Sequence, residues 1–319
     1  MNRRQFALAT AGTFAFPAWA RTQPFTQGLL WRVTRPGMPA SHVFGTIHDA
    51  HERLAVLPSP VEASLGRSKS LMVEFLPDAY SRERFLEAAM FVDRQTLEGL
   101  IGAEDFARVL EQLAPIGLER DFVNKLKPWG VLLNLRAAKP AAVASVDAQL
   151  IERARARRLA IAQIEGVEEQ IFTFDECPLD TQIALLRHSL GHRTELIELS
   201  AQTVSAYLER DLAAIWQLRE DFIARYPEVA QHQALMTKRV LYDRSVVMAY
   251  RMQRELRRGN AFVAVGALHL HGSRGVLALL GEDGYRTTRV FRIDRRPHFR
   301  PRQQHAGAGG GGAARLRRD

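Results

Sequence analysis

The sequence predicts an α/β protein whose mixed β-sheet contains an internal duplication and is surrounded by helices. Two apolar β-type runs, residues 43–48 (VFGTIH) and 262–269 (FVAVGALH), each end in Gly-x-x-His. Each glycine interrupts β-branched and aromatic residues, where it weakens a strand but lets another backbone or a ligand come close. Helical patterns occupy most of the chain between the two motifs and predict a helical middle segment.

The first motif is expected to follow a β-hairpin. Residues 29–34 and 41–44 are β-prone and flank a turn rich in proline and glycine at 35–39. Apolar runs at 70–75, 142–147 and 160–165 are predicted as further strands. Residues 285–291 alternate in polarity, as in a half-exposed edge strand.

The remaining segments are predicted to be mostly helical. Pro128 suits the first position of a buried helix, Asp147 is a candidate cap for a helix beginning at Ala148, and Gly166 breaks a strand before the next helix. Long helices are expected over residues 179–208, 212–225 and 228–258.

The N-terminal residues have the pattern of an export signal. Arg3 and Arg4 precede a short apolar stretch and an Ala18-x-Ala20 ending, so residues 1–20 are predicted to be a signal peptide of the twin-arginine type, cleaved near Ala20. An ordinary secretory signal with two coincidental arginines is the alternative. Either signal predicts a periplasmic or secreted protein.

The formal charge of +9 is concentrated at the two ends of the chain. Two of these charges are Arg3 and Arg4, and residues 295–319 contribute a net +6, which leaves +1 for residues 21–294. A net charge of +1 argues against binding to nucleic acid. Residues 21–294 are expected to form a single domain, and no segment of the chain is apolar for long enough to span a membrane. The Arg/Gly-rich tail, 295–319, is predicted to be disordered.

Polar side chains follow several of the predicted strands. They are His48, Glu74, Asp147, Glu165 and His269. Because the carboxyl ends of parallel strands meet at one edge of a sheet, these side chains are expected to lie together. Glu74 has no evident capping role, which favours a function, whereas Glu165 fits equally well a function or a pair with a nearby arginine.

The histidines differ in their context. The duplicated motif favours a shared site for His48 and His269, and a metal is the commonest reason to gather imidazoles. His271 is a weaker candidate, and His42 and His51 are weaker still. The other histidines considered are interpreted as solvated helix residues: His188, His192 and His232.

Arg244 is expected to lie on the apolar face of its helix. At ~100° per residue, Val240, Leu241 and Met248 fall within about 60° of it. A guanidinium in that position needs an anion, either a substrate or a buried carboxylate such as Glu74 or Glu255.

The ordered set of these motifs resembles the TraB/GumN family, which includes the metal-dependent Tiki-type proteases. The similarity extends from about residue 29 to 291 and includes these segments: Leu30-Trp31, residues 44–48, Val73-Glu74, residues 127–129, 146–150, 164–170, Asp243-Arg244 and 265–272. The resemblance implies a mixed α/β fold with a site shared between the two Gly-x-x-His motifs, Glu74 and Arg244. Ser245 stands where the family often has asparagine, and His271 where it often has proline.

The leading hypothesis is metal-dependent hydrolysis of a peptide or related acyl bond. His48, His269 and Glu74 would hold a divalent cation, with Mn, Co and Zn all suited to this set. Glu74 is the alternative base, Arg244 would bind a substrate carboxylate or a developing oxyanion, and Glu165 is a further catalytic candidate. The sequence contains neither a His-Glu-x-x-His helix nor a Gly-x-Ser-x-Gly elbow.

Two competing hypotheses use the same residues. In one, His48, His269 and Glu74 act as acid and base without a metal, as in an esterase. In the other, the protein is a periplasmic binding protein that holds a peptide, a metal or a haem without turnover.

Overall fold

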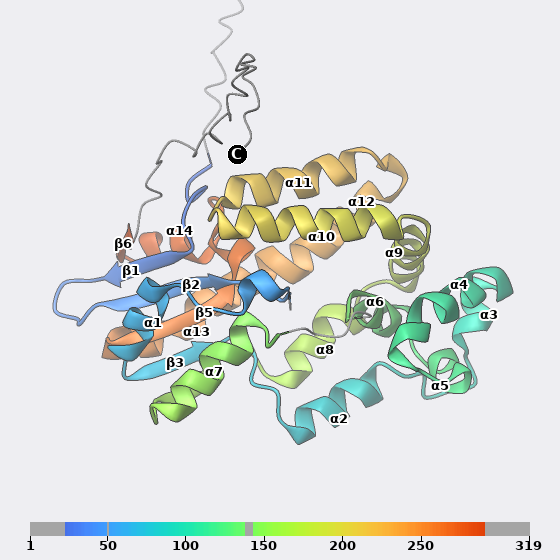
Figure 1. Cartoon of the computed structure of the whole chain (residues 1–319), viewed down its shortest axis with the longest axis horizontal. Coiled ribbons are helices and arrows are strands. Elements are labelled where there is room, and N and C mark those ends of the chain that lie inside the picture. The colour runs from blue at the N-terminus through green and yellow to red at the C-terminus, as the bar shows by residue number, and fades with distance from the viewer. Residues whose placement is uncertain (1–22, 50, 138–142, 291–319) are drawn as a thin grey trace, which may run out of the picture.

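A computed structural model describes residues 23–49, 51–137 and 143–290. The predicted signal peptide (1–20) and tail (295–319) lie outside these residues. In the described part, six strands form one sheet in the order β4-β3-β5-β2-β1-β6 (Figure 1). The strands are β1 (Leu30–Thr34), β2 (Ser41–Thr46), β3 (Ser70–Val73), β4 (Ala160–Gln163), β5 (Ala261–Gly266) and β6 (Arg286–Arg289).

The sheet is mixed, as predicted. Strands β4, β3, β5 and β2 run parallel to one another, whereas β1 is antiparallel to both β2 and β6. The β1–β2 pair is the predicted hairpin, and β6 is the predicted edge strand. In the β2–β5 register Gly45 pairs with Val265 and Thr46 with Gly266, so the duplicated motifs end side by side.

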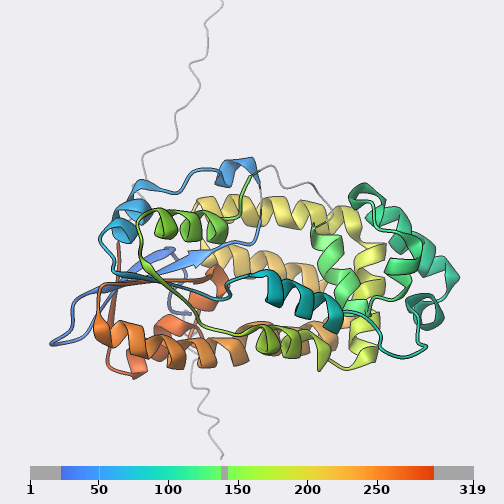
Figure 2. The same ribbon diagram turned by 90° about the horizontal axis from the view of Figure 1, so that it is seen from below.

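Helices cover both faces of the sheet. Figure 2 shows α7 on one side of the sheet and α13 on the other. The α-helices are α1 (Ser59–Gly66), α2 (Ala79–Ala88), α3 (Leu97–Ile101), α4 (Ala103–Leu113), α5 (Arg120–Asn124), α6 (Pro128–Ala137), α7 (Val146–Ala156), α8 (Val167–Asp175), α9 (Leu179–Gly191), α10 (Arg193–Leu208), α11 (Leu212–Ala224), α12 (Ala230–Thr237), α13 (Arg244–Arg258) and α14 (Val276–Glu282). Shorter helical segments are η1 (Glu52–Leu54), η2 (Ala114–Ile116), η3 (Pro227–Val229), η5 (Ala267–Leu270) and the π-helical η4 (Lys238–Asp243).

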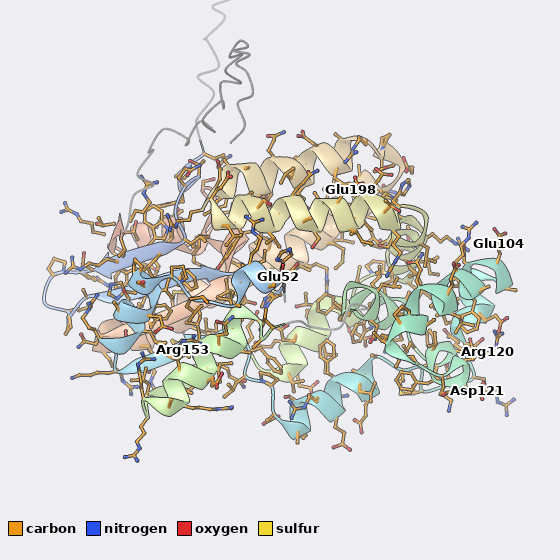
Figure 3. All side chains as sticks on the ribbon, in the orientation of Figure 1. Glu52, Glu104, Arg120, Asp121, Arg153 and Glu198 are labelled. Atoms are coloured by element: carbon orange, nitrogen blue, oxygen red, sulfur yellow. The ribbon has the colours of Figure 1, made fainter. Side chains whose placement is uncertain are left out.

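The helical middle segment has a hydrophobic core of its own. This core joins α3, α4, α6 and α9 beside the sheet, and Trp129 stacks on Phe174 with ring centroids 5.8 Å apart. Charged side chains, including Glu104, Arg120 and Asp121, lie on the far end of this segment (Figure 3). None of the described helices is both long and apolar enough to cross a bilayer.

Several sequence predictions were wrong in detail. The predicted strand at 142–147 is absent from its described part, 143–147, because α7 begins at Val146. Ser145, not Asp147, caps this helix by accepting a hydrogen bond from the Ala148 N–H. At the start of a helix the first backbone N–H groups have no partner within the helix, and the Ser145 hydroxyl accepts a hydrogen bond from one of them.

The long predicted helices are interrupted, and one histidine is misplaced. Residues 179–208 form α9 and α10 with a break at His192, and residues 228–258 are divided among η3, α12, η4 and α13. His188 was expected to be solvated, but its side chain packs beside Phe222 and Tyr226 and is only 7% exposed.

Candidate functional site

The parallel pairing of β2 and β5 brings the two motif histidines to the same edge of the sheet. His48 follows the end of β2, and His269 lies in η5, directly after β5. Gly45 permits this packing, since a Cβ there would lie 2.9 Å from the Cα of Ala267. The sequence-based interpretation of this glycine as a point of close backbone approach is therefore confirmed.

Glu74 occupies the centre of the cluster. It follows β3, which pairs with the other side of β5. Its Oε1 accepts a hydrogen bond from the Gly266 N–H, and its Oε2 accepts one from Nη2 of Arg244 at 2.7 Å. Nε2 of His269 lies 3.8 Å from Oε1, and Nε2 of His48 lies 3.9 Å from Oε2. A Cβ at Gly266 would lie 3.2 Å from Oε1, so the lack of a side chain at the second motif glycine leaves room for this carboxylate.

Arg244 joins two buried carboxylates. Its Nη2 donates to Glu74 and to Glu165, each at 2.7 Å, and its Nε also donates to Glu165. The expected inward position of Arg244 is confirmed, and its partners are Glu74 and Glu165 instead of Glu255. Burial opposes the charge on this guanidinium, but Glu165 and Glu74 hold its pKa above the ordinary value.

Electrostatics keep Glu74 ionised. Burial disfavours its charge, yet His48, His269 and Arg244 together hold the pKa of this carboxyl well below its usual range. A carboxylate with a depressed pKa can act as a ligand or a charge partner, but it is a poor general acid at neutral pH.

Asp147 has a role that the sequence reasoning missed. The start of α7 places its carboxylate 3.2 Å from Nδ1 of His48, at the edge of the cluster. Asp147 and then Glu74 raise the pKa of His48 to about 10. The sequence did place Asp147 among the polar side chains of this edge, but its position before a helix favoured a capping role.

His269 is held in one tautomer by Ser245. The Ser245 hydroxyl donates to the Leu241 carbonyl and lies 2.8 Å from Nδ1 of His269. Because a hydroxyl has a single proton, its oxygen is left to accept from Nδ1–H, so this network assigns the lone pair of the neutral ring to Nε2. Burial lowers the pKa of His269 to about 4, which keeps the ring neutral at pH 7.

The unprotonated Nε2 of His269 therefore faces the negatively charged Oε1 of Glu74 across 3.8 Å. Two electron pairs that face each other in a buried site repel unless a cation lies between them. The cluster also has three carboxylates, Glu74, Asp147 and Glu165, against the guanidinium of Arg244 and the protonated ring of His48, which leaves a net charge of −1.

The donor chemistry fits a divalent cation. Both imidazoles direct Nε2 toward Glu74, while their Nδ1 atoms face Asp147 and Ser245, the outer partners that metal-binding histidines ordinarily have. No three His, Cys, Asp or Glu side chains in the described part of the chain are already arranged to hold a metal ion. Bonds of about 2.0–2.2 Å place tetrahedral donors about 3.4 Å apart, so the present separations of 3.8 and 3.9 Å are slightly wide.

His271 and His42 make their contacts outside this cluster. The His271 ring stacks on Trp216 with centroids 5.3 Å apart. His42 is on β2 but toward its opposite end, where it pairs with Arg32. The structure thus brings together the expected side chains and adds Ser245. The expected ones are His48, Glu74, Asp147, Glu165, Arg244 and His269.

The fold and the site define an α/β protein with a polar centre at the carboxyl ends of its parallel strands. The sequence profile of the TraB/PrgY/gumN family matches residues 29–289, and the chain belongs to this family.

The chain is also similar to the uncharacterized protein YbaP of Shigella flexneri and to YbaP of Escherichia coli (strain K12). Each is 25% identical over 253 residues, which cover 78% of this chain and 90% of the relative. No solved structure gives a significant match.

Proposed function

We propose that this protein is a metal-dependent hydrolase that cleaves a peptide or related acyl bond. The observation that carries the proposal is the 3.8 Å approach of the buried His269 Nε2 to the Glu74 carboxylate, with Nδ1 of the same ring occupied by Ser245. His269, His48 and Glu74 would hold a divalent cation, which supplies Lewis acidity for activating water and polarising a carbonyl.

The remaining side chains have supporting roles in this proposal. Arg244 fixes Glu74, and its positive charge would favour an oxyanion or a substrate carboxylate bound nearby. Glu165 holds Arg244 in place and is itself held by Gln170. Asp147 lies 3.2 Å from Nδ1 of His48, whose side chain is 66% exposed and forms the solvent side of the cluster.

The first test is metal binding. Protein stripped with a chelator is titrated by calorimetry with Mn²⁺, Co²⁺ and Zn²⁺ separately. We expect one cation per chain, and a loss of at least about tenfold in affinity for His48→Ala and His269→Ala. His232→Ala is the matched control, because the His232 imidazole bonds to Thr181 in the helical segment. The metal affinity of this variant should equal that of the wild type.

The second test is turnover of a peptide library, followed by mass spectrometry. Cleavage that stops on chelation and returns with the metal supports the proposal. Cleavage by the stripped protein would instead indicate metal-free acid–base chemistry by the same residues. Retention of peptides without cleavage would identify a binding protein.

We also propose that the protein acts in the periplasm, on the strength of the predicted signal at residues 1–20. Replacing Arg3 and Arg4 by lysines should leave the protein in the cytoplasm if the twin-arginine route is used. Unchanged export of this variant would favour the ordinary secretory signal.

A further inference from the structure

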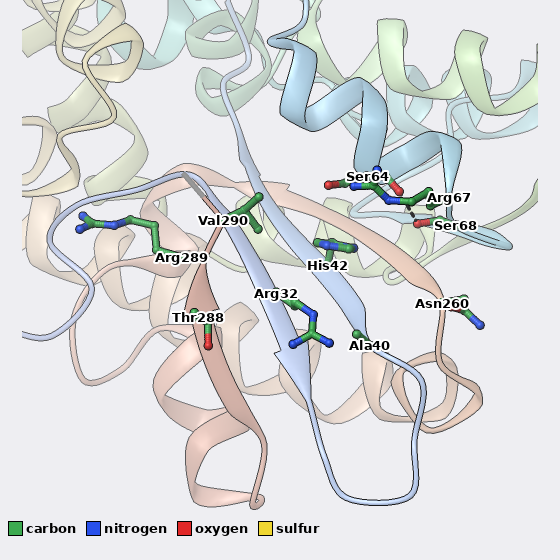
Figure 4. Close-up of a pocket in the computed structure, with 10 residues that line it drawn as sticks. All are labelled: Arg32, Ala40, His42, Ser64, Arg67, Ser68, Asn260, Thr288, Arg289 and Val290. Carbon is green, nitrogen blue, oxygen red and sulfur yellow. Dashed lines mark hydrogen bonds between the residues drawn. The ribbon is translucent and has the colours of Figure 1, made fainter. Parts of the chain in front are cut away.

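A cavity lies toward the opposite end of β2 from the histidine site. It has a volume of about 520 Å³ and is bounded by β1, the start of β2, β6 and the C-terminal end of α1 (Figure 4). The side chains that matter here are Arg32, His42, Ser64, Arg67, Asn260 and Thr288. None of the residues that the structure brings together at the histidine site lines this cavity.

The strand register aligns part of the lining. Arg32 on β1 pairs with His42 on β2 and with Thr288 on β6, so the three side chains form a row on one face of the sheet. Arg67, at the end of α1, faces this row across the cavity (Figure 4). Arg289 lines the cavity too, but its guanidinium donates to the Gln27 carbonyl.

The positive charge in this cavity is not balanced by the protein. No Asp or Glu is among the described lining residues, and within the described chain neither Arg32 nor Arg67 has a carboxylate within 4.0 Å. Burial lowers the pKa of His42, and Arg67 and Arg32 lower it further. An anion bound here would therefore face two arginines that no carboxylate of the described lining neutralises.

Ser64 adds an unpaired hydroxyl. The residue is completely buried, and its Oγ has no hydrogen-bond partner in the described structure. Neighbouring Ser68, by contrast, donates to the Ser64 carbonyl at 2.9 Å. A buried polar atom without a partner costs the desolvation free energy of that group, so a ligand in the adjoining cavity would gain a donor if the Ser64 side chain rotated toward it.

We propose that this cavity binds a small molecule carrying a phosphate monoester, with the phosphate held between Arg32 and Arg67. Guanidinium groups match the oxygens of phosphate geometrically, and the nearly doubly charged phosphate balances two arginines. The Ser64 hydroxyl and the Asn260 amide supply further donors. About 520 Å³ exceeds the need of a bare phosphate and lies in the range of small-molecule pockets, so an organic group of about the size of a sugar accompanies it.

The test is calorimetry on the full chain at fixed ionic strength with glucose 6-phosphate, inorganic phosphate, glucose and citrate. We expect glucose 6-phosphate to bind, inorganic phosphate to bind more weakly, and glucose and citrate not to bind. Arg32→Gln and Arg67→Gln should each reduce the affinity at least tenfold. Arg254→Gln, an exposed arginine on α13, should leave it unchanged. Absence of phosphate binding, equal binding of citrate, or unchanged affinity in the two cavity variants would overturn the proposal.

Ser64→Ala separates a ligand-binding role from a structural one. Removing an unpaired buried hydroxyl should raise the Tm of the ligand-free protein and lower its affinity for phosphate. Ser68→Ala is the matched control and should lower the Tm, since its hydrogen bond is lost. A Ser64→Ala protein with a lower Tm and unchanged phosphate affinity would refute the assigned role.

Discussion

The pairing of Arg244 with two carboxylates makes its replacement a severe test of the site. The side chains of Glu74 and Glu165 are only 7% and 4% exposed. Arg244→Gln preserves a polar side chain but removes the charge, which leaves both carboxylates buried without their main partner. Breaking a buried ion pair in this way destabilises a protein by roughly 3–5 kcal/mol.

Thermal unfolding measures this loss directly. At about 2–4 °C per kcal/mol for a domain of this size, the Tm should fall by about 6–20 °C. Arg251→Gln is the matched control, because Arg251 and Glu169 are 39% and 41% exposed and their pair contributes less than about 1 kcal/mol. Equal Tm losses in the two variants would refute the conclusion that burial sets the strength of the Arg244 cluster.

The pH dependence gives an independent check on the same variant. The pKa of Glu74 is depressed in the folded protein, so its stabilising contribution is present above the ordinary value of 4.5 and is lost as pH falls through the folded value. Without Arg244 the pKa of Glu74 is lowered less. The stability difference between Arg244→Gln and the wild type should therefore narrow below pH 4.5, and a difference that is constant from pH 7 to pH 3 would contradict this account.

Three further predictions follow from the same geometry. Gly45→Ala should destabilise the fold by about 1–3 kcal/mol in urea denaturation, because its Cβ would meet the Ala267 backbone at 2.9 Å. Ser245→Ala should lower metal affinity about 10–100-fold and stability by about 1–3 kcal/mol, since the buried Nδ1–H of His269 loses its acceptor. In metal-free protein His48 should titrate near pH 10 by NMR, so its stabilising charge is present below pH 6.5 and lost as pH rises through about 10.

Each of these predictions has a specific contrary result. A Cβ at Gly281 would meet nothing within 4 Å, so Gly281→Ala should not lower the free energy of unfolding. Equal changes in the free energy of unfolding for Gly45→Ala and Gly281→Ala would contradict the steric argument. Wild-type metal affinity in Ser245→Ala would show that the His269 tautomer held by Ser245 does not determine metal affinity. Titration of His48 near pH 6.5 would show that Asp147 and Glu74 do not act on its ring.

Much of the site could be predicted because strand ends have simple geometry. The apolar runs before His48, Glu74 and His269 are short and end in polar residues, and parallel pairing brings such ends together. Arg244 was placed inward correctly because a helical wheel depends only on local spacing.

Other features depended on tertiary contacts that the sequence does not reveal. Residues 143–147 combine β-branched residues with helix-start residues, and the capping hydrogen bond of Ser145 decided between them. Asp147 then became a partner of His48 because α7 packs beside β3. Ser245 resembled a lost family contact, yet its hydroxyl reaches His269.

The position of β5 also has a consequence for how the chain acquires its structure. This strand comes late in the sequence but lies in the interior of the sheet, between β2 and β3. Until residue 266 has been synthesised, β2 and β3 each lack a neighbour and expose unpaired backbone groups that invite association with other chains. Such distant pairing slows folding, so a nascent or truncated chain ending before β5 should depend on chaperones to remain unaggregated.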